Sequence, residues 1–313
     1  MRALVSGASG FVGRALQARL RAEGWDVARI VRASPGPGEV GLDLARRRLD
    51  LAGLDDGRLA DVDAVFHLAG EPITPTRWSP AKRERIRASR VVSTDVLARA
   101  LAASEARRTA FVCASAIGFY GDRGDEVLDE SSAAGTGFLA EVCRAWEAAA
   151  APAREAGIRV VNARLGVVLG PDGGALARLV PLFSLGLGAR LGSGRQWTSF
   201  VSLHDAVGAL VHLATRPDLA GPVNVTAPEP ARNAELTAAL AAALHRRSVL
   251  AVPRGLLVLA LGRDVARDVA LASQRVLPRR LEADGFAFAH RDVASAVEAA
   301  LAQRRRRRGR RDG

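Results

Sequence analysis

This chain has very little lysine, tyrosine or cysteine, and it has no long hydrophobic run. Its most apolar short run, Leu256–Leu261, is far below the roughly 18 residues that a membrane span requires. The N-terminal apolar run meets glycines too early for a signal peptide, so we expect a cytoplasmic protein with no membrane span. Cys113 and Cys143 show neither metal nor disulfide spacing. We therefore interpret them as reduced, buried thiols, and we expect no metal site.

Negative charge is also scarce, since 45 Lys and Arg residues face 33 Asp and Glu residues, for a net charge of +12. Half of this charge lies in the last ten residues, RRRRRGRRDG, which hold seven Arg and one Asp. This stretch has no apolar residue to pack, so the sequence predicts a disordered tail over 303–313. An Arg run can bind nucleic acid or acidic membranes through phosphates. Without interleaved aromatic residues or a recognition motif, we favour a solvated tail and expect no nucleic-acid partner.

Strand and helix patterns alternate along the chain, which predicts an α/β protein built on a parallel sheet covered on both faces. The expected strands are Arg2–Ser6, Asp26–Val31, Ala64–Leu68, Thr109–Ser115, Ile158–Leu165 and Pro222–Thr226. The expected helices are Phe11–Ala22, 79–103 and Phe138–Ala156. We predict a doubly wound, Rossmann-type domain over 1–170, completed by later strands, and a smaller C-terminal substrate lobe over 171–302. The last part of this lobe, about 250–302, is expected to be helical.

The segment Gly7-Ala8-Ser9-Gly10-Phe11-Val12-Gly13 carries the most information, because it follows the first strand and opens the first helix. In such a turn the first glycine allows the sharp bend and the second lets the backbone approach a pyrophosphate. The third lets the helix pack closely on the sheet, and the helix N-terminus offers free N–H groups to the phosphates. A dinucleotide site is therefore expected here.

The end of the second strand decides which dinucleotide is expected. NAD sites usually place an acid there to bond the ribose 2′-hydroxyl, whereas this strand ends in Arg32. A guanidinium would bind a 2′-phosphate, so we predict NADP(H), with Arg29 as a second possible contact. Asp43 either faces the adenine amino group or is an ordinary loop carboxylate. The Arg residues also have a simpler interpretation as solvated surface charges.

Several segments together resemble the extended short-chain dehydrogenase/reductase superfamily. They are the glycine turn, Asp63–Gly70, Ser115–Gly121, Arg164–Gly170 and Phe200–Asp205. Further segments resemble one atypical branch, an NAD-dependent epimerase/dehydratase-like family with a C-terminal domain of unknown function. These are Arg77-Trp78, Ser89–Thr94, Gly192–Trp197, Gln274–Pro278 and Gly285-Phe286. The resemblance covers roughly residues 1–302. The predicted cofactor-binding residues are Gly7, Ser9, Gly10, Phe11, Val12, Gly13, Arg32, Asp43, Leu68, Ala69, Gly70 and Arg164.

The superfamily's usual catalytic pair is missing from this chain. That pair is Tyr-x-x-x-Lys on one helix, in which the Lys lowers the pKa of the Tyr. Here the single Lys, Lys82, precedes the single Tyr, Tyr120. Leu139 and Cys143 stand at the expected positions of the pair, within one residue. Ala116 replaces the usual Ser, and Arg90 stands where many relatives have Asn. The branch resembled here is itself known for lacking these groups, so the standard mechanism does not carry over.

Ser115 and Tyr120 are the remaining weak catalytic candidates. Tyr120 can donate a proton or simply close a loop by hydrogen bonding, and we favour the second interpretation. Arg90 and Arg164 can bind an anionic substrate, or form ion pairs with Glu71, Glu141 or Glu147. His67 lies in a buried strand and is expected to be a core residue.

The sequence leaves two main functions open. The first is an NADP(H)-dependent oxidoreductase or epimerase that acts on a small carbonyl or sugar-like substrate through a non-standard proton donor. The second is a non-catalytic NADP(H)-binding module that reports redox state to a protein partner. Helices 79–103 and 138–156 correspond to those that pair subunits in relatives, which is compatible with a homodimer. The substrate is unknown.

Overall fold

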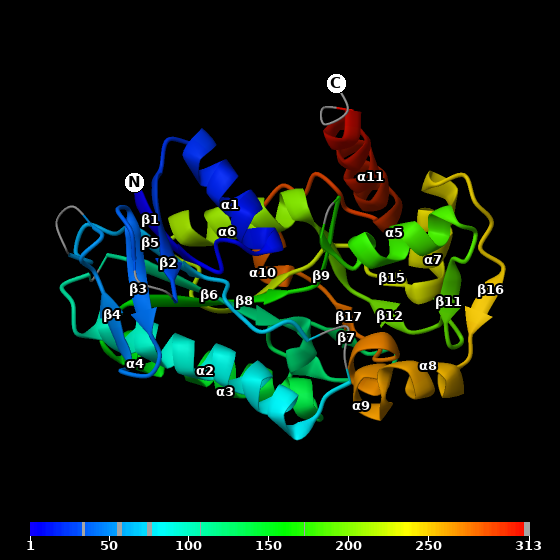
Figure 1. Cartoon of the computed structure of the whole chain (residues 1–313), viewed down its shortest axis with the longest axis horizontal. Helices are drawn as coiled ribbons and strands as arrows, with labels where there is room; N and C mark the ends of the chain where they lie inside the picture. The colour runs from blue at the N-terminus through cyan, green and yellow to red at the C-terminus, as the bar shows by residue number, and fades with distance from the viewer. Residues whose placement is uncertain (33–34, 55–57, 74–76, 107, 172, 310–313) are drawn as a thin grey trace.

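An eight-stranded sheet organises the N-terminal part of the molecule (Figure 1). The structure is a computed structural model that describes residues 1–32, 35–54, 58–73, 77–106, 108–171 and 173–309, with side chains to residue 305. The strand order is β14-β8-β6-β5-β1-β2-β3-β4. All neighbours are parallel except β3 and β4. The strands are β1 (Arg2–Ser6), β2 (Asp26–Val31), β3 (Glu39–Asp43), β4 (Arg48–Asp50), β5 (Ala64–His67), β6 (Ala110–Ala116), β8 (Arg159–Leu165) and β14 (Gly221–Val225).

Helices cover both faces of this sheet, which confirms the doubly wound Rossmann-type prediction. Helices α1 (Phe11–Ala22) and α6 (Leu203–Thr215) lie on one face. Helices α2 (Pro80–Ala102), α3 (Phe138–Ala148) and α4 (Ala151–Glu155) lie on the other. The chain order of the strands reverses between β1 and β5. In such sheets ligands bind beyond the carboxyl ends of the strands at this reversal.

Short-range signals explain where the long helices begin and end. Helix α2 starts after Ser79, whose side chain accepts a hydrogen bond from the Lys82 amide, and Pro80 occupies its first turn. The prediction of one continuous helix over Phe138–Ala156 is wrong, because the chain divides into α3 and α4. Pro152 lies in the first turn of α4 and has no amide hydrogen to continue the α3 ladder.

Strands β3 and β4, at one side of the sheet, are absent from the sequence prediction. Both are short, and β4 consists of Arg48, Leu49 and Asp50, which show no extended apolar alternation. They form an antiparallel hairpin in which β3 also pairs with β2, so that only β4 lies at the sheet edge with a single partner. Asp43 therefore ends a strand and does not lie in a loop.

The rest of the chain forms small sheets and helices beside the large sheet (Figure 1). The strands are β9 (Val167–Gly170), β10 (Gly173–Gly174) and β13 (Phe200–Ser202); β11 (Ala189–Leu191) with β16 (Leu250–Val252); β12 (Trp197–Thr198) with β15 (Ala231–Arg232); and β7 (Val127–Leu128) with β17 (Arg275–Val276). The helices are α5 (Leu176–Ser184), α7 (Asn233–Ala243), α8 (Arg254–Leu261), α9 (Arg263–Val265), α10 (Arg279–Ala283) and α11 (Val293–Gly309). A 3₁₀ turn, η1, covers Ile117–Tyr120, and a π-helical turn, η2, covers Ala266–Ala270.

Two segments after residue 170 belong to the Rossmann part. Strand β14 pairs with β8 in the large sheet, and α6 packs against one face of that sheet. The separate core of the C-terminal part includes Leu176, Phe183, Phe200, Leu240 and Val297. That the two parts are domains with a boundary near residue 170 stays a prediction.

Helix α11 continues to Gly309, so residues 303–309 are helical where the sequence predicted a disordered tail. Arginine is a good helix former, and cations at a helix C-terminus interact favourably with its dipole. Residues 310–313 of the predicted tail lie outside the described residues. Across the part of the chain that the structure describes, no helix is long and apolar enough to cross a membrane.

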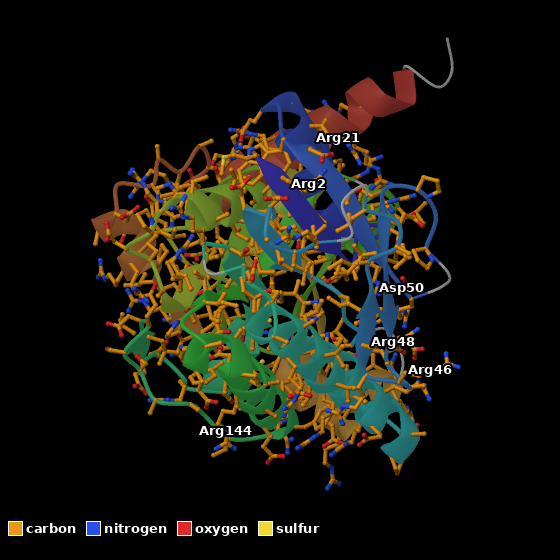
Figure 2. The ribbon with its side chains drawn as sticks, turned by 90° about the vertical axis from the view of Figure 1, so that its left-hand side faces the viewer. Arg2, Arg21, Arg46, Arg48, Asp50 and Arg144 are labelled. Atoms are coloured by element: carbon orange, nitrogen blue, oxygen red, sulfur yellow. The ribbon has the colours of Figure 1, made fainter. Side chains whose placement is uncertain are left out.

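Basic side chains are dispersed over the surface of the Rossmann part. In Figure 2 the labelled Arg21, Arg46, Arg48 and Arg144 lie at the periphery, on different elements. Some of this charge is paired locally, as Arg46 is with Asp43 at 3.1 Å. Such exposed pairs contribute little to stability, about 0–1 kcal/mol each.

Candidate functional site

The glycine turn between β1 and α1 has the geometry of a phosphate cradle. Gly7 adopts φ +67°, a conformation that side chains other than glycine rarely tolerate. A Cβ on Gly13 would stand 2.2 Å from the Gly7 carbonyl oxygen, so only glycine allows α1 to pack this closely. Gly10 precedes the helix and supplies no capping side chain. The first amides of α1 therefore remain available to an anion.

A groove of about 440 Å³ extends from this turn beyond the carboxyl ends of β1, β2 and β5. Its volume lies in the range of ligand sites in proteins. Seven of the predicted cofactor-binding residues line it: Gly7, Ser9, Gly10, Arg32, Leu68, Ala69 and Gly70. Sequence reasoning did not identify Pro72, Ser89 or Ser93 on its far wall. Pro72 comes from the segment after β5, and the two serines come from α2, within the Ser89–Thr94 segment that carries the family resemblance.

Arg32 and Arg29 differ in their availability to a ligand. Both line the groove. Arg29 forms an ion pair with Glu39 on β3 at 2.5 Å. Arg32 is exposed and forms no ion pair within 4.0 Å among the described residues, although its charge is near enough to help lower the pKa of Glu71. Across the groove, Glu71 accepts a hydrogen bond from Lys82 at 2.6 Å, which lowers the pKa of that carboxyl. Arg32 is therefore the guanidinium that is free to bind a phosphate.

Four other predicted cofactor residues lie near the turn but do not line the groove. The Phe11 ring packs against Gly173, where an added Cβ would stand 2.1 Å from it. Val12 packs on the core between the sheet and α1. Gly13 acts through close packing, as described above. Asp43 accepts hydrogen bonds from the amide and the guanidinium of Arg46, which lower its pKa. The adenine-facing role of Asp43 stays a prediction.

A buried chain of hydrogen bonds lies under the groove. Ser6 Oγ is 2.6 Å from His67 Nδ1, and His67 Nε2 is 3.0 Å from Ser93 Oγ. Burial lowers the pKa of His67 to about 3, so the ring is neutral. Ser6 Oγ already accepts the Leu68 amide, and Ser93 Oγ donates to the Ser89 carbonyl. His67 therefore accepts at Nδ1 and donates at Nε2. The core interpretation of His67 fits this arrangement.

Arg164, Glu147 and Tyr120 form a second buried network at the carboxyl ends of β6 and β8. Arg164 donates to both Glu147 oxygens, at 2.8 and 2.9 Å. The Arg164 guanidinium also lies 3.5 Å from the centre of the Phe119 ring. Burial lowers the pKa of Arg164, but the hydrogen bonds and charge of Glu147 outweigh this and raise it. The sequence predicts Arg164 as a cofactor-binding residue or as the partner of an acid. In the structure its guanidinium forms an ion pair with Glu147.

Both weak catalytic candidates belong to this network. The Tyr120 hydroxyl donates to Asn224 at 2.7 Å and accepts from Arg164 at 3.0 Å, and the side chain is fully buried. Burial raises the pKa of Tyr120 to about 12. Ser115 Oγ donates to Glu147 at 2.7 Å. Neither Ser115 nor Tyr120 lines the nucleotide groove. This favours the structural interpretation of Tyr120.

Leu139 and Cys143 lie one helical turn apart on α3, facing Gly118 of η1. A Cβ on Gly118 would be 3.4 Å from Leu139 Cβ and 3.8 Å from Cys143 Sγ. Burial raises the pKa of Cys143 to about 12, so it is an inert thiol. Lys82 is paired with Glu71. No Tyr–Lys pair is therefore present among the described residues.

Comparisons with known proteins agree with this geometry. The sequence model of the NAD dependent epimerase/dehydratase family matches residues 3–226 of this chain. This chain belongs to that family. A domain of unknown function, DUF1731, matches residues 252–300. The resemblance inferred from the motifs is thus confirmed for both the family and its C-terminal extension.

Members of the family with similar sequences span nearly the whole chain. An epimerase family protein of Mycobacterium bovis is 45% identical over 293 residues, which cover 94% of this chain and 95% of that protein. The crystal structure of human epimerase family protein SDR39U1 with NADPH is 33% identical, with a TM-score of 0.87, and covers 96% of this chain and 99% of that one. A nucleoside-diphosphate sugar epimerase from Corynebacterium glutamicum is 36% identical, with a TM-score of 0.78; the match covers 99% of this chain but 61% of that one. This epimerase-family chain is therefore an NAD(P)-binding protein.

Proposed function

We propose that this protein binds NADP(H) in preference to NAD(H), and that it is an oxidoreductase or epimerase acting on a small carbonyl or sugar-like substrate. The glycine turn and the first amides of α1 would hold the pyrophosphate, and Arg32 would hold the 2′-phosphate. When bound, the nicotinamide supplies hydride exchange. The groove residues of this chain would position it.

The observation that carries the proposal is Arg32, which directly follows β2, is exposed, lines the groove and forms no ion pair within 4.0 Å among the described residues. A carboxylate at this place would repel a 2′-phosphate, whereas a guanidinium forms charge-assisted hydrogen bonds with it. The crystal structure of the human relative with NADPH supports the same choice.

The test is a fluorescence titration of the protein with NADPH and NADH, repeated with Arg32→Asp. We expect NADPH to bind at least about tenfold more tightly than NADH, because charge-assisted hydrogen bonds contribute about 1.5–3 kcal/mol. Arg32→Asp should abolish that preference. Arg21→Asp is the matched control, since Arg21 lies on α1 and does not line the groove (Figure 2). Equal affinity of the original protein for both nucleotides would overturn the NADP(H) assignment.

A second candidate function is a non-catalytic module that senses redox state through bound NADP(H) and acts on a protein partner. The commitment of Tyr120, Lys82 and Arg164 to other residues favours it. The two functions make different predictions. An enzyme oxidises bound NADPH with at least one compound of a broad carbonyl panel. A sensor does not, and its protease sensitivity differs between the NADPH and NADP+ complexes.

We also propose a cytoplasmic location, on the basis that Cys113 and Cys143 are both free and buried thiols. We further propose that two copies of the chain form a homodimer through α2 and α3. Light scattering, which measures the mass of the particle in solution, tests this.

A further inference from the structure

A second, smaller cavity lies beyond the carboxyl end of β6 and shares no lining residue with the nucleotide groove. Its volume is about 180 Å³, comparable to about six water molecules of the liquid. One wall is formed by η1 and the start of α3, with Gly118, Gly137 and Leu139. The other wall comes from the C-terminal segment, with Arg267, Asp268 and Gln274.

Asp268 lies in this wall with only one of its two oxygens paired. Its Oδ1 accepts a hydrogen bond from Arg267 Nε at 2.5 Å. Its Oδ2 is buried and accepts no hydrogen bond from any residue that the structure describes. The side chain is 10% exposed. A buried carboxylate oxygen without a donor is costly, so it is expected to have a partner in the working protein.

The start of α3 faces the same carboxylate. A Cβ on Gly137 would stand 3.5 Å from Asp268 Oδ2 and 3.8 Å from Arg267 Nη2. Gly137 precedes the helix with φ +100° and provides no capping side chain. The first amides of this 11-residue helix thus have no side-chain acceptor there. The wall of the cavity therefore includes an unpaired acceptor close to a helix start that has no side-chain cap.

We propose that this cavity binds a small, neutral, hydroxyl-bearing molecule, whose hydroxyl donates to Asp268 Oδ2 while its oxygen accepts from the first amides of α3. A hydroxyl can do both at one point. An ammonium group cannot accept, and it would meet Arg267 and the positive end of the helix dipole. A carboxylate would be repelled by Asp268. The identification of this molecule as the substrate rests on the proposed function, but its binding does not.

The π-helical turn η2 gives a local reason for this placement. Asp268 lies within η2, Ala266–Ala270, and such turns occur frequently at functional sites. The segment is held against α2 by an ion pair between Arg83 and Asp264. The wider turn thus presents Asp268 from the C-terminal lobe toward α3, on which Leu139 and Cys143 replace the usual catalytic pair.

The test measures binding of glycerol, erythritol and xylitol to the full chain without nucleotide, by saturation-transfer NMR. Propylamine and propionate serve as charged comparisons of similar size. We expect at least one polyol to bind with about millimolar affinity, as a ligand of this size allows, and the charged compounds to bind more weakly. Asp268→Asn should weaken polyol binding about tenfold, because it replaces the free carboxylate oxygen or turns an amide NH₂ toward the α3 amides.

Two further variants keep the result interpretable. Glu298→Gln is the matched control, because Glu298 is an exposed carboxylate of α11 that does not line the cavity. Its polyol affinity should be unchanged. Ala272→Leu fills the cavity while retaining Asp268, and it should block binding even if Asp268→Asn fails to fold. Equal polyol affinity in all variants, or tighter binding of a charged compound, would overturn the inference. NADPH binding without polyol binding overturns only this inference, and polyol binding without NADPH binding overturns only the proposed cofactor.

Discussion

Replacement of Glu147 by Gln tests the buried network that holds Arg164. Side-chain exposure is 12% for Glu147 and 4% for Arg164, so solvent screens their interaction little. The two Glu147 oxygens accept three hydrogen bonds, two from Arg164 and one from Ser115. Gln keeps the shape but removes the charge and leaves the guanidinium buried without its counter-ion.

The expected loss of unfolding free energy is about 3 kcal/mol. Removing one partner of a buried ion pair typically costs about 3–5 kcal/mol. The lower end applies here, because Arg164 retains the Tyr120 hydroxyl and the Phe119 ring as neighbours. The double variant Glu147→Gln/Arg164→Met should lose less than the sum of the two single variants, since it leaves no unpaired buried charge.

Urea unfolding followed by tryptophan fluorescence measures these losses, and Trp146 lies on the same helix as Glu147. Glu141→Gln is the matched control, because Glu141 is an exposed residue of α3, and such surface changes stay within about 0.5 kcal/mol. If Glu147→Gln lost no more stability than Glu141→Gln, Arg164 would not depend on Glu147. It would then be free to bind the cofactor, as the sequence suggested.

Three other perturbations follow from the structure. The folded pKa of His67, about 3, lies below the ordinary value of 6.5, so the contribution of the neutral ring to stability is complete above pH 6.5 and is lost by about 1.4 kcal/mol per pH unit between 6.5 and about 3. Between pH 6.5 and 5 the unfolding free energy of His67→Gln, measured in urea, should therefore fall less steeply than that of the original protein or of the exposed control His245→Gln. Tyr120 is the only tyrosine, so the ultraviolet signal of tyrosinate should appear near pH 12 and not near the ordinary value of 10; a transition near 10 in folded protein would contradict its burial. Gly13→Ala should weaken NADPH binding at least about tenfold by displacing α1 from Gly7, whereas Gly255→Ala, in open space on α8, should raise the melting temperature slightly; unchanged NADPH affinity in Gly13→Ala would refute the close-packing role.

The sequence predicted the parts of the fold that depend on local patterns. The β1 strand, the glycine turn and α1 are adjacent in the chain, and their residue pattern matches the observed elements. The pairing of β3 with β4 could not be predicted in this way, because three residues such as Arg48–Asp50 carry no periodicity and depend on the neighbouring strand for their conformation. Pro152 starts α4 and separates it from α3, whereas the alanine-rich sequence on both sides favours helix, which is why the pattern alone predicts one continuous helix.

The candidate site likewise has residues that motifs predicted and residues that only the packing of distant segments brings together. The groove residues from Gly7 to Gly70 come from strand ends that motifs mark. The environment of Asp268 was not predictable, because the cavity wall opposite it is formed by Gly118 and Gly137, well over a hundred positions earlier. Likewise, the sequence left Glu71, Glu141 and Glu147 as possible partners of Arg164 or Arg90. The tertiary structure, in which Glu147 of α3 lies beside Arg164 of β8, shows that Glu147 is the partner of Arg164.

The late position of β14 has a consequence for how the chain is synthesised. This strand pairs with β8, yet Val225 leaves the ribosome about 60 residues after its neighbour Leu165. At about 5–20 residues per second, the β8 edge remains unpaired for roughly 3–12 s. An open edge of this kind invites pairing with another nascent chain. Fragments that end near residue 170 are therefore expected to aggregate during translation, whereas those that extend beyond Val225 should remain in solution.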